Sequence, residues 1–192
     1  TQGQYEVVTG QNPSAFKADG TKNLPVENLT MDEAINFCKK LTELEKNAGR
    51  LKDGWSFGLP SEAEWEYACR AGVKTAYSWG NAMDESKGNF KSGGAVSTCT
   101  VGQYPPNAWG FHDMHGNAWE RVSNRYSATF YSSSPTRGKD PWGPTGGRSW
   151  VARGGAWNSD PLALRASRRE KIGWDTKNNT LGFRLMLKNS GK

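Results

Sequence analysis

The sequence has few of the residues that usually cross-link or metallate a small domain. Its 192 residues include three cysteines and two histidines, too few for a disulfide framework or a zinc ligand set. No stretch approaches the roughly 18 apolar residues that a membrane-spanning helix needs, and mean hydropathy is −0.79. We therefore expect no membrane span. Cys38 and Cys69 fall on apolar faces of predicted helices, so we expect both to be buried free thiols.

Bulky aromatic residues, in contrast, are abundant. Nine Trp, seven Phe and six Tyr provide enough apolar surface for a packed core, which excludes an intrinsically disordered chain. The 23 Gly and nine Pro indicate many turns and long loops. Length and composition together predict one loop-rich domain over 1–192. The chain starts at Thr1 rather than at a methionine, as it would if an upstream segment had been removed.

Helix signals are confined to the first third of the chain. Thr30 with Glu33, and Ser61 with Glu64, form capping boxes ahead of apolar residues at helical spacing. After Gly72 short apolar pieces alternate with Gly-, Pro- and Asn-rich stretches. We expect helices over 1–8, 30–48 and 61–71, strands at 77–79, 150–152 and 183–187, and one long surface loop over 127–148. The predicted class is α+β.

Positive charge is concentrated in the last third. Residues 137–192 carry 12 Lys or Arg and 4 Asp or Glu, a net charge of +8, whereas 1–136 carry 13 and 15, a net charge of −2. Solvated or paired arginines explain this surplus better than a nucleic-acid surface, because no short run is densely basic. An arginine network that ties loops together and a surface that recognises carboxylates, sugars or proteins remain equally open.

The segment from Asp113 to Glu120 (DMHGNAWE) could hold a hard cation. Two carboxylates flank a glycine-containing turn, which can direct backbone carbonyls inward. On spacing alone we favour the alternative, in which Asp113 caps a turn and Glu120 pairs with an arginine. His112 and His115 receive no catalytic role. The sequence also lacks a Gly-x-Ser-x-Gly elbow and a phosphate-binding P-loop.

Four phrases together resemble the formylglycine-generating enzyme (sulfatase-modifying factor) family. They occur in the order expected for that family and span most of the chain: residues 59–72 (LPSEAEWEYACRAG), 101–120 (VGQYPPNAWGFHDMHGNAWE), 153–157 (RGGAW) and 181–185 (LGFRL). The resemblance implies a C-type-lectin-like fold with little regular secondary structure. It also implies that the strand which usually precedes the helix at Thr1 is missing from this chain.

The resemblance changes the expectation for the acidic segment. In calcium-binding members the matching positions supply two side chains and two carbonyls, which here are those of Asp113, Gly116, Ala118 and Glu120. We therefore expect structural calcium at these four residues. A second calcium site of the family begins at positions similar to Asn89 and Phe90. Its later Asp has no match in this sequence, so we do not expect this second site.

The departures from the family concern catalysis. Oxidase members bind copper through two cysteines shortly after the phrase that matches 153–157, and copper(I) favours such soft ligands. No cysteine follows Cys99 here, so we expect neither copper nor formylglycine-generating activity. The sulfoxide synthases of the family hold iron in a separate N-terminal domain, which this chain does not contain.

These observations lead to a functional hypothesis. We expect a non-catalytic, calcium-stabilised domain that binds an acidic protein or glycan, as in the retroelement-diversified variable receptors of the family. The binding loops are 157–180, with Trp157, Asn158, Arg165, Arg168 and Trp174 as candidate ligand-binding residues. The alternative is an enzyme, or a domain of one, that uses a site without cysteine. We expect no nucleic-acid partner, a bacterial source and an extracytoplasmic location (periplasmic, surface or secreted).

Overall fold

The computed structural model describes residues 1–17, 22–133 and 143–189. Three of its helices begin at the predicted caps. They are α1 (Gln2–Thr9), α2 (Met31–Asn47) and α3 (Glu62–Arg70), and each starts with a complete capping box. Gly10 ends α1 in the left-handed conformation, at φ 76°. The end of α3 differs from the prediction, because Ala71 already takes this conformation, at φ 46°, one residue before Gly72.

Two sheets organise the rest of the described chain. The larger sheet has the order β4-β3-β2-β5, in which β2 and β5 are parallel and the other pairs antiparallel. A separate pair joins β1 to β6 in antiparallel register. The bounds are β1 (Trp55–Gly58), β2 (Trp119–Arg125), β3 (Ser149–Arg153), β4 (Glu170–Gly173), β5 (Leu181–Phe183) and β6 (Met186–Asn189). The short elements are η1 (Glu85–Lys87), η2 (Lys91–Gly93), η3 (Pro161–Leu164) and α4 (Phe130–Ser133).

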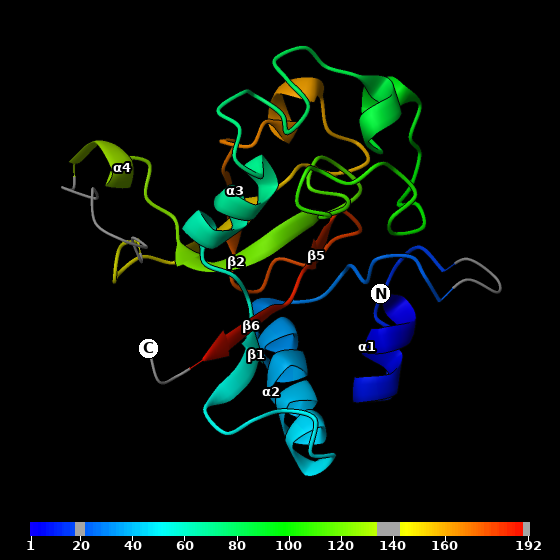
Figure 1. Cartoon of the computed structure of the whole chain (residues 1–192), viewed down its shortest axis with the longest axis vertical. Helices are drawn as coiled ribbons and strands as arrows, with labels where there is room; N and C mark the ends of the chain where they lie inside the picture. The colour runs from blue at the N-terminus through cyan, green and yellow to red at the C-terminus, as the bar shows by residue number, and fades with distance from the viewer. Residues whose placement is uncertain (18–21, 134–142, 190–192) are drawn as a thin grey trace.

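The larger sheet is covered on both faces. Figure 1 shows α3 on one side of β2 and α2 on the other. Along β3, Trp150 and Ala152 pack into the core of α1 and α2, whereas Val151 packs with Trp65 and Cys69 of α3. A strand that is buried on both faces lacks the apolar–polar alternation of a half-exposed strand. This explains why the sequence did not indicate β2.

The strand expected at 183–187 is wrong as a single element. The chain leaves the larger sheet after Phe183 and enters the smaller sheet at Met186. Between them, the side chain of Arg184 turns inward to Glu120, so Arg184 and Leu185 do not continue either strand. The apolar run therefore serves two sheets.

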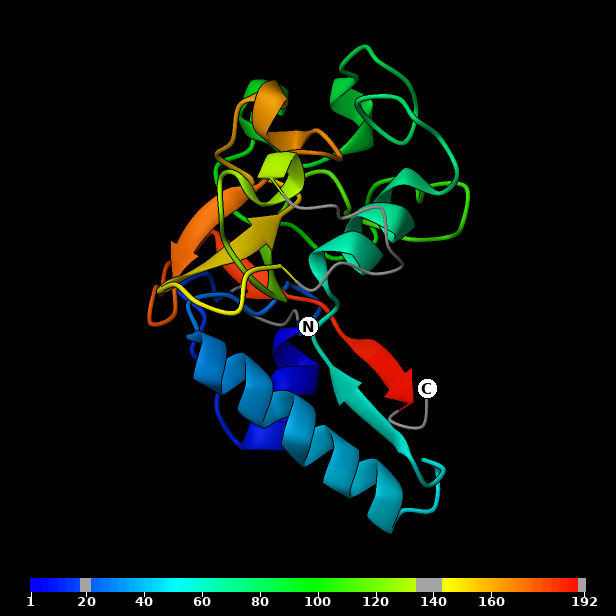
Figure 2. The same ribbon diagram turned by 90° about the vertical axis from the view of Figure 1, so that its left-hand side faces the viewer.

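Other expectations need smaller corrections. The strand predicted at 77–79 is only a bridge between Tyr77 and Gly80. The helical spacing of Leu44 from Phe37 and Leu41 predicts that it lies on the buried face of α2. It is instead 48% exposed, because the helix extends beyond the sheet (Figure 2). Within the predicted loop 127–148, α4 is helical and residues 134–142 lie outside the described residues.

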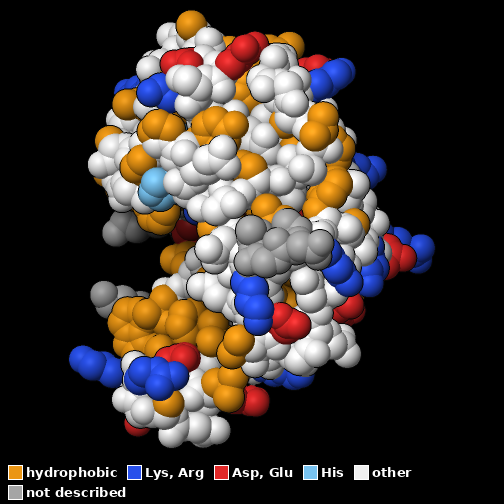
Figure 3. Space-filling model, turned by 90° about the vertical axis from the view of Figure 1, so that its right-hand side faces the viewer, with side chains coloured by type: hydrophobic (Ala, Val, Ile, Leu, Met, Phe, Trp, Pro, Cys, Tyr) orange, Lys and Arg blue, Asp and Glu red, His pale blue; other side chains and the backbone are white. Residues whose placement is uncertain are grey.

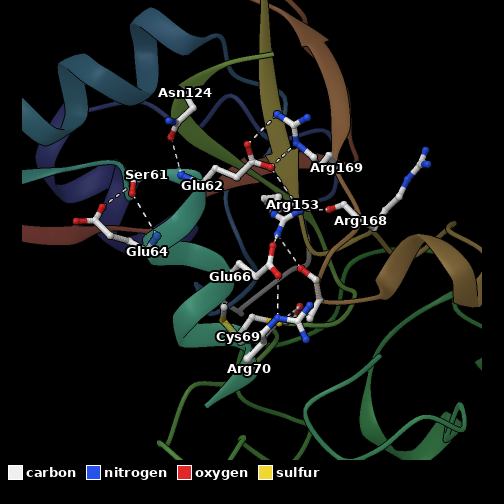
Figure 4. Close-up of polar contacts among 12 residues, drawn as sticks. Ser61, Glu62, Glu64, Glu66, Cys69, Arg70, Asn124, Arg153, Arg168 and Arg169 are labelled. Carbon is white, nitrogen blue, oxygen red and sulfur yellow. Dashed lines mark hydrogen bonds and ion pairs between the residues drawn. The ribbon is translucent and has the colours of Figure 1, made fainter. Parts of the chain in front are cut away.

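A buried network of ion pairs joins α3 to the larger sheet (Figure 4). Arg153, fully buried on β3, lies 3.5 Å from Glu62 and donates a hydrogen bond to Glu66. Arg169, just before β4, donates to both carboxylate oxygens of Glu62 at 2.6 and 2.9 Å. Arg153 also donates to the backbone carbonyl of Ala166 at 2.7 Å. These contacts fix α3 and the segment before β4 relative to β3.

Two glycines let the chain turn sharply after β3. Gly154 and Gly155 have φ of 98° and 79°, which side chains rarely tolerate. A Cβ at Gly155 would lie 2.9 Å from Leu164, and one at Gly154 would lie 3.2 Å from Trp65. Paired glycines beside an aromatic residue predict close backbone approach or positive φ, and both occur here.

Removing the central arginine should destabilise the fold strongly. Arg153→Met removes the donor of the carbonyls of Ala166 and Arg168 and of one oxygen of Glu66, and it leaves the buried Glu62 with less positive charge beside it. This should cost about 3–5 kcal/mol of unfolding free energy. Chemical denaturation measures this loss. Arg50→Met provides the control, because Arg50 pairs with Glu45 on the exposed surface, and it should leave the melting temperature nearly unchanged. Equal losses in both variants would contradict a structural role for the network.

Candidate acidic pocket and ligand surface

The four residues of the predicted calcium site border one cavity. Asp113, Gly116, Ala118 and Glu120 line a space of about 450 Å³ that α1 and the loop before β2 enclose. Rings from α1, α2 and the end of β5 form much of its wall. Figure 3 shows a hollow between the upper and lower halves of this face, with hydrophobic side chains along its lower wall. The structure thus brings the four residues together, whereas the sequence could only list them.

Glu120 is already well supplied with hydrogen-bond donors. Its Oε1 accepts from Nη2 of Arg184 at 2.6 Å, and its Oε2 accepts from Nε of Arg184 and from Nε1 of Trp65. The parallel pairing of β2 with β5 brings them together, because Glu120 is in register with Gly182. Such bidentate pairs are among the stronger ones in proteins. The arginine pairing that the spacing of the acidic segment favoured is therefore present.

Asp113 is compensated less completely. It has a left-handed backbone conformation, at φ 56°, and its Oδ2 accepts from the backbone N–H of Gly102 at 2.7 Å. Burial, with a smaller contribution from the charge of Glu120, raises the pKa of Asp113 above its usual range. Two carboxylates face one guanidinium here, which leaves one excess negative charge.

The oxygen atoms that line this pocket are the kind of ligand that a hard cation prefers. Two carboxylates and the backbone at Gly116 and Ala118 line a common cavity, and an added cation would offset the excess charge. Within the described residues, no group of three or more His, Cys, Asp or Glu side chains could hold a metal ion. Backbone oxygens would therefore have to complete the coordination.

The positions that resemble the start of the second calcium site have structural contacts. Asn89 donates from Nδ2 to the carbonyl of Ser97 at 2.9 Å, and its own carbonyl accepts from the N–H of Asn117 at 2.8 Å. Phe90 is fully buried beside Tyr77 and Leu164. These contacts tie η2 to the segment before β2.

The two histidines have different surroundings. His112 is exposed, and its Nδ1 lies 2.9 Å from the carbonyl of Tyr104. His115 is buried, and its Nε2 accepts from the N–H of Ser78 at 3.1 Å, so Nδ1 carries the proton and donates to the carbonyl of Leu164 at 2.7 Å. Burial lowers the pKa of His115 to about 4. This neutral, enclosed imidazole has a structural role.

The thiols are poor nucleophiles at neutral pH. Burial raises the pKa of Cys38 to about 11, that of Cys69 to about 12 and that of Cys99 to about 11. Cys69 lies 3.5 Å from Nε2 of His115, but that nitrogen already accepts from Ser78. Since the thiolate is the reactive form, none of the three is activated.

The predicted ligand residues lie along one segment rather than in one cluster. Figure 2 shows this segment running from η3 at one end of the molecule along β4 toward α2. Trp157 is half-buried, donates to the carbonyl of Asn179 at 3.1 Å and contacts the ring of Phe16. Trp174 is also half-buried, packs on Trp150 and donates to Asp32. Asn158 is exposed. Gly173 and Asp175-Thr176 predict a turn that exposes Trp174, and its ring is partly exposed. Trp157, which we expect to be mostly buried beside the glycine pair 154–155, is mostly covered.

The arginines of this region divide into two groups. Arg165 and Arg168 are exposed, and Arg168 pairs at the surface with Glu170 at 2.9 Å. Arg153 and Arg169, in contrast, belong to the buried network around Glu62. The arginine network therefore accounts for Arg153 and Arg169, whereas the side chains of Arg165 and Arg168 lie outside it.

Two functional contacts were not recognised in the sequence. Arg184 was quoted only as part of a family phrase, and Arg121 of β2 was not singled out. Arg121 is fully buried and donates to the carbonyls of Leu29 and Thr176. Arg121 lies within β2 and Arg184 directly follows β5. The residues around each arginine in the sequence do not indicate its partner, which only the folded sheet reveals.

The fold class and the pocket together define a C-type-lectin-like domain of the formylglycine-generating type. The model of the sulfatase-modifying factor enzyme 1-like domain matches residues 1–189. The chain therefore belongs to the sulfatase-modifying factor family, as the four phrases predicted. No helix in the described ranges is long and apolar enough to cross a membrane.

Relatives within this family carry different names. The formylglycine-generating enzyme of Streptomyces coelicolor is 32% identical over 193 residues, which cover 91% of this chain and 56% of that protein. The protein named serine/threonine-protein kinase pkn1 of Chlamydia pneumoniae is 39% identical over 127 residues, which cover 66% of this chain and 20% of that protein. The chain thus spans about a fifth to about half of the length of these relatives.

Solved structures agree with the fold. The Treponema denticola variable protein 1 matches with a TM-score of 0.84 and 27% identity, over 98% of this chain and 81% of that one. PvdO from Pseudomonas aeruginosa matches with a TM-score of 0.77 and 24% identity, over 98% and 77%. The relatives thus include a variable protein, a formylglycine-generating enzyme and a protein named as a kinase.

The buried imidazole predicts loss of stability in acid. The pKa of His115 in the folded state, about 4, lies below the value of about 6.5 in an unfolded chain. The unfolded state therefore binds the extra proton first, and the contribution of His115 is complete above pH 6.5 and lost between pH 6.5 and 4. The loss should be on the order of 3 kcal/mol.

Denaturation of His115→Gln between pH 7 and pH 4 tests this. Relative to its own stability at pH 7, the variant should lose less stability than the wild type. His112→Gln is the matched control on the exposed loop and should keep the wild-type slope. A wild-type slope in His115→Gln would contradict the assignment of a buried neutral imidazole.

Proposed function

We propose that the domain is a non-catalytic ligand-binding module that presents the segment 157–180. The separation of the arginines carries this proposal. Arg153 and Arg169 stabilise the fold from inside, which leaves Arg165 and Arg168 exposed on the same segment. Exposed guanidinium groups are typical of recognition surfaces. Because these exposed side chains are cationic, an acidic protein or glycan is the partner that fits.

The family relationships support this role. The Treponema denticola variable protein 1 has the same fold across nearly the whole chain, and a variable protein needs a stable scaffold beneath an adaptable surface. In this chain the scaffold contacts of 157–180 come from Arg153, Arg169 and the half-buried Trp157 and Trp174. No cysteine follows Cys99, so the chain lacks the cysteine pair through which the oxidase relatives bind copper, and this argues against the oxidase role.

An acidic probe tests the surface. The wild type should bind a heparin-derived octasaccharide or a Glu-rich peptide, and Arg165→Ala and Arg168→Ala should each weaken binding about tenfold, as expected for the loss of one charge-assisted contact. Their melting temperatures should stay nearly unchanged, since both side chains are exposed. Titration calorimetry and thermal melts measure the two quantities.

Arg169→Ala is the matched control, because Arg169 donates to both oxygens of the buried Glu62. It should lower the melting temperature by several degrees. The proposal fails if neither probe binds the wild type. It also fails if Arg165→Ala and Arg168→Ala lower the melting temperature as Arg169→Ala does and leave the affinity unchanged.

We further propose that calcium binds in the acidic pocket and stabilises the scaffold. Asp113 and Glu120 carry more negative charge than Arg184 balances, and Asp113 bears the excess. Calcium would offset this charge with the backbone at Gly116 and Ala118 as further ligands. Because calcium would bind the folded state alone, it would stabilise that state by mass action.

Calcium titration of the chelator-treated protein tests this second proposal. The melting temperature should rise with calcium and saturate, by about 2.7 kcal/mol of stabilisation at a hundredfold excess over the dissociation constant. Asp113→Asn keeps an oxygen that accepts from Gly102 and should abolish the calcium response without unfolding the domain. A wild-type melt that is insensitive to both chelator and calcium would overturn the assignment.

A further inference from the structure

Arg121 is an unusual buried cation. Its side chain is fully buried on β2, and its Nη2 donates to the carbonyl of Leu29 at 2.9 Å and to that of Thr176. Its Nε and Nη1 have no hydrogen-bond partner among the described residues. No carboxylate of these residues lies within ion-pair distance of it, and Glu33 acts only at longer range. In the described part of the chain, one nitrogen of the guanidinium therefore makes all of its hydrogen bonds.

Such an arginine does not serve stability well. Burial disfavours its charge and lowers the pKa of Arg121 to about 10, and buried donors without partners cost free energy. Arg153 is buried to the same extent but contacts Glu62 and Glu66. Even complete buried ion pairs often contribute little net stability, and Arg121 has no carboxylate partner among the described residues. The contacts of Arg121 must therefore be explained by what they hold in place.

The two carbonyls that Arg121 joins belong to distant segments. Leu29 lies just before Thr30, the N-cap of α2, and Thr176 lies in the turn that follows β4. The same two segments also meet through the N–H of Met31, which donates to the carbonyl of Trp174 at 3.1 Å, and through the N–H of Asn28, which donates to that of Asn178 at 2.9 Å. Arg121 lies beneath this junction.

We propose that Arg121 is a positioning residue, which fixes the turn 174–178 of the ligand surface against the start of α2 and gives up stability to do so. It acts through the carbonyl of Thr176 and does not touch the ligand itself. This role rests on the proposed function in one respect, namely that the turn belongs to a binding surface. Whether Arg121 holds the turn in place does not depend on that function, and we call this the geometric part of the proposal.

Amide hydrogen exchange in Arg121→Met tests the geometric part. The amides of Asn28, Met31 and Gly173 report on the turn, because Asn28 and Met31 donate to its carbonyls and Gly173 donates to Oγ1 of Thr176 at 2.9 Å. They should exchange at least tenfold faster in the variant. The amide of Ser123, which donates to Pro60 from the same strand as Arg121, should keep its wild-type rate.

The melting temperature provides the second readout. Arg121→Met removes an uncompensated buried charge but also leaves the carbonyls of Leu29 and Thr176 without this donor. It should therefore melt near the wild-type temperature, whereas Arg153→Met should melt far below it. Arg121→Lys retains a donor for the two carbonyls and should restore slow exchange at Met31 and Asn28. The proposal is overturned if exchange at these amides is unchanged in Arg121→Met. It is also overturned if that variant unfolds or melts as low as Arg153→Met, because Arg121 would then be a structural residue.

Binding of the acidic probe separates this proposal from the proposed function. If the turn belongs to the binding surface, Arg121→Met should weaken binding of the octasaccharide about tenfold while the melting temperature holds. If the wild type binds neither acidic probe, the proposed function fails, and the exchange rates still decide whether Arg121 positions the turn. Unchanged affinity together with faster exchange would remove the turn from the ligand surface.

Discussion

The buried ion pairs of Arg153 with Glu62 and Glu66 are the interaction on which the rest of the domain depends. They join α3 to β3, and Arg153 also holds the carbonyls of Ala166 and Arg168. A chain with so many loops has few regular elements to fix their relative positions, so this one charge orders several segments at once. Breaking such a pair leaves buried charge uncompensated, which makes the whole arrangement cooperative.

Arginines of the last third of the chain contribute both to the scaffold and to the proposed binding surface. Basic residues of the last third either turn inward to a carboxylate, as Arg169 and Arg184 do, or remain in solvent, as Arg165 does. Because the inward-facing Arg169 directly follows the exposed Arg168 in the chain, the loops that would bind a ligand are held by their own neighbours. Arg121 of β2 also points inward, but it binds backbone carbonyls instead of a carboxylate, at a cost in stability.

Local signals in the sequence predicted the local structure. Capping boxes at Thr30 and Ser61 marked the starts of α2 and α3, since those bonds form within four residues. The strands were harder to predict, because β2 is buried on both faces and pairs with partners far along the chain. The acidic segment was found from residue types and the family resemblance. Its partner Arg184 depends on parallel pairing that no local pattern reveals.

The central claim is that ligand binding uses the exposed residues of 157–180 and not the acidic pocket. A crystal structure of the domain with the heparin-derived octasaccharide would test it most directly. The account predicts that the bound octasaccharide contacts Arg165 or Arg168 beside a half-buried tryptophan of the same segment, with the ion pairs of Arg153 unchanged. An octasaccharide bound in the 450 Å³ pocket beside Asp113, with Arg165 and Arg168 free, would contradict it.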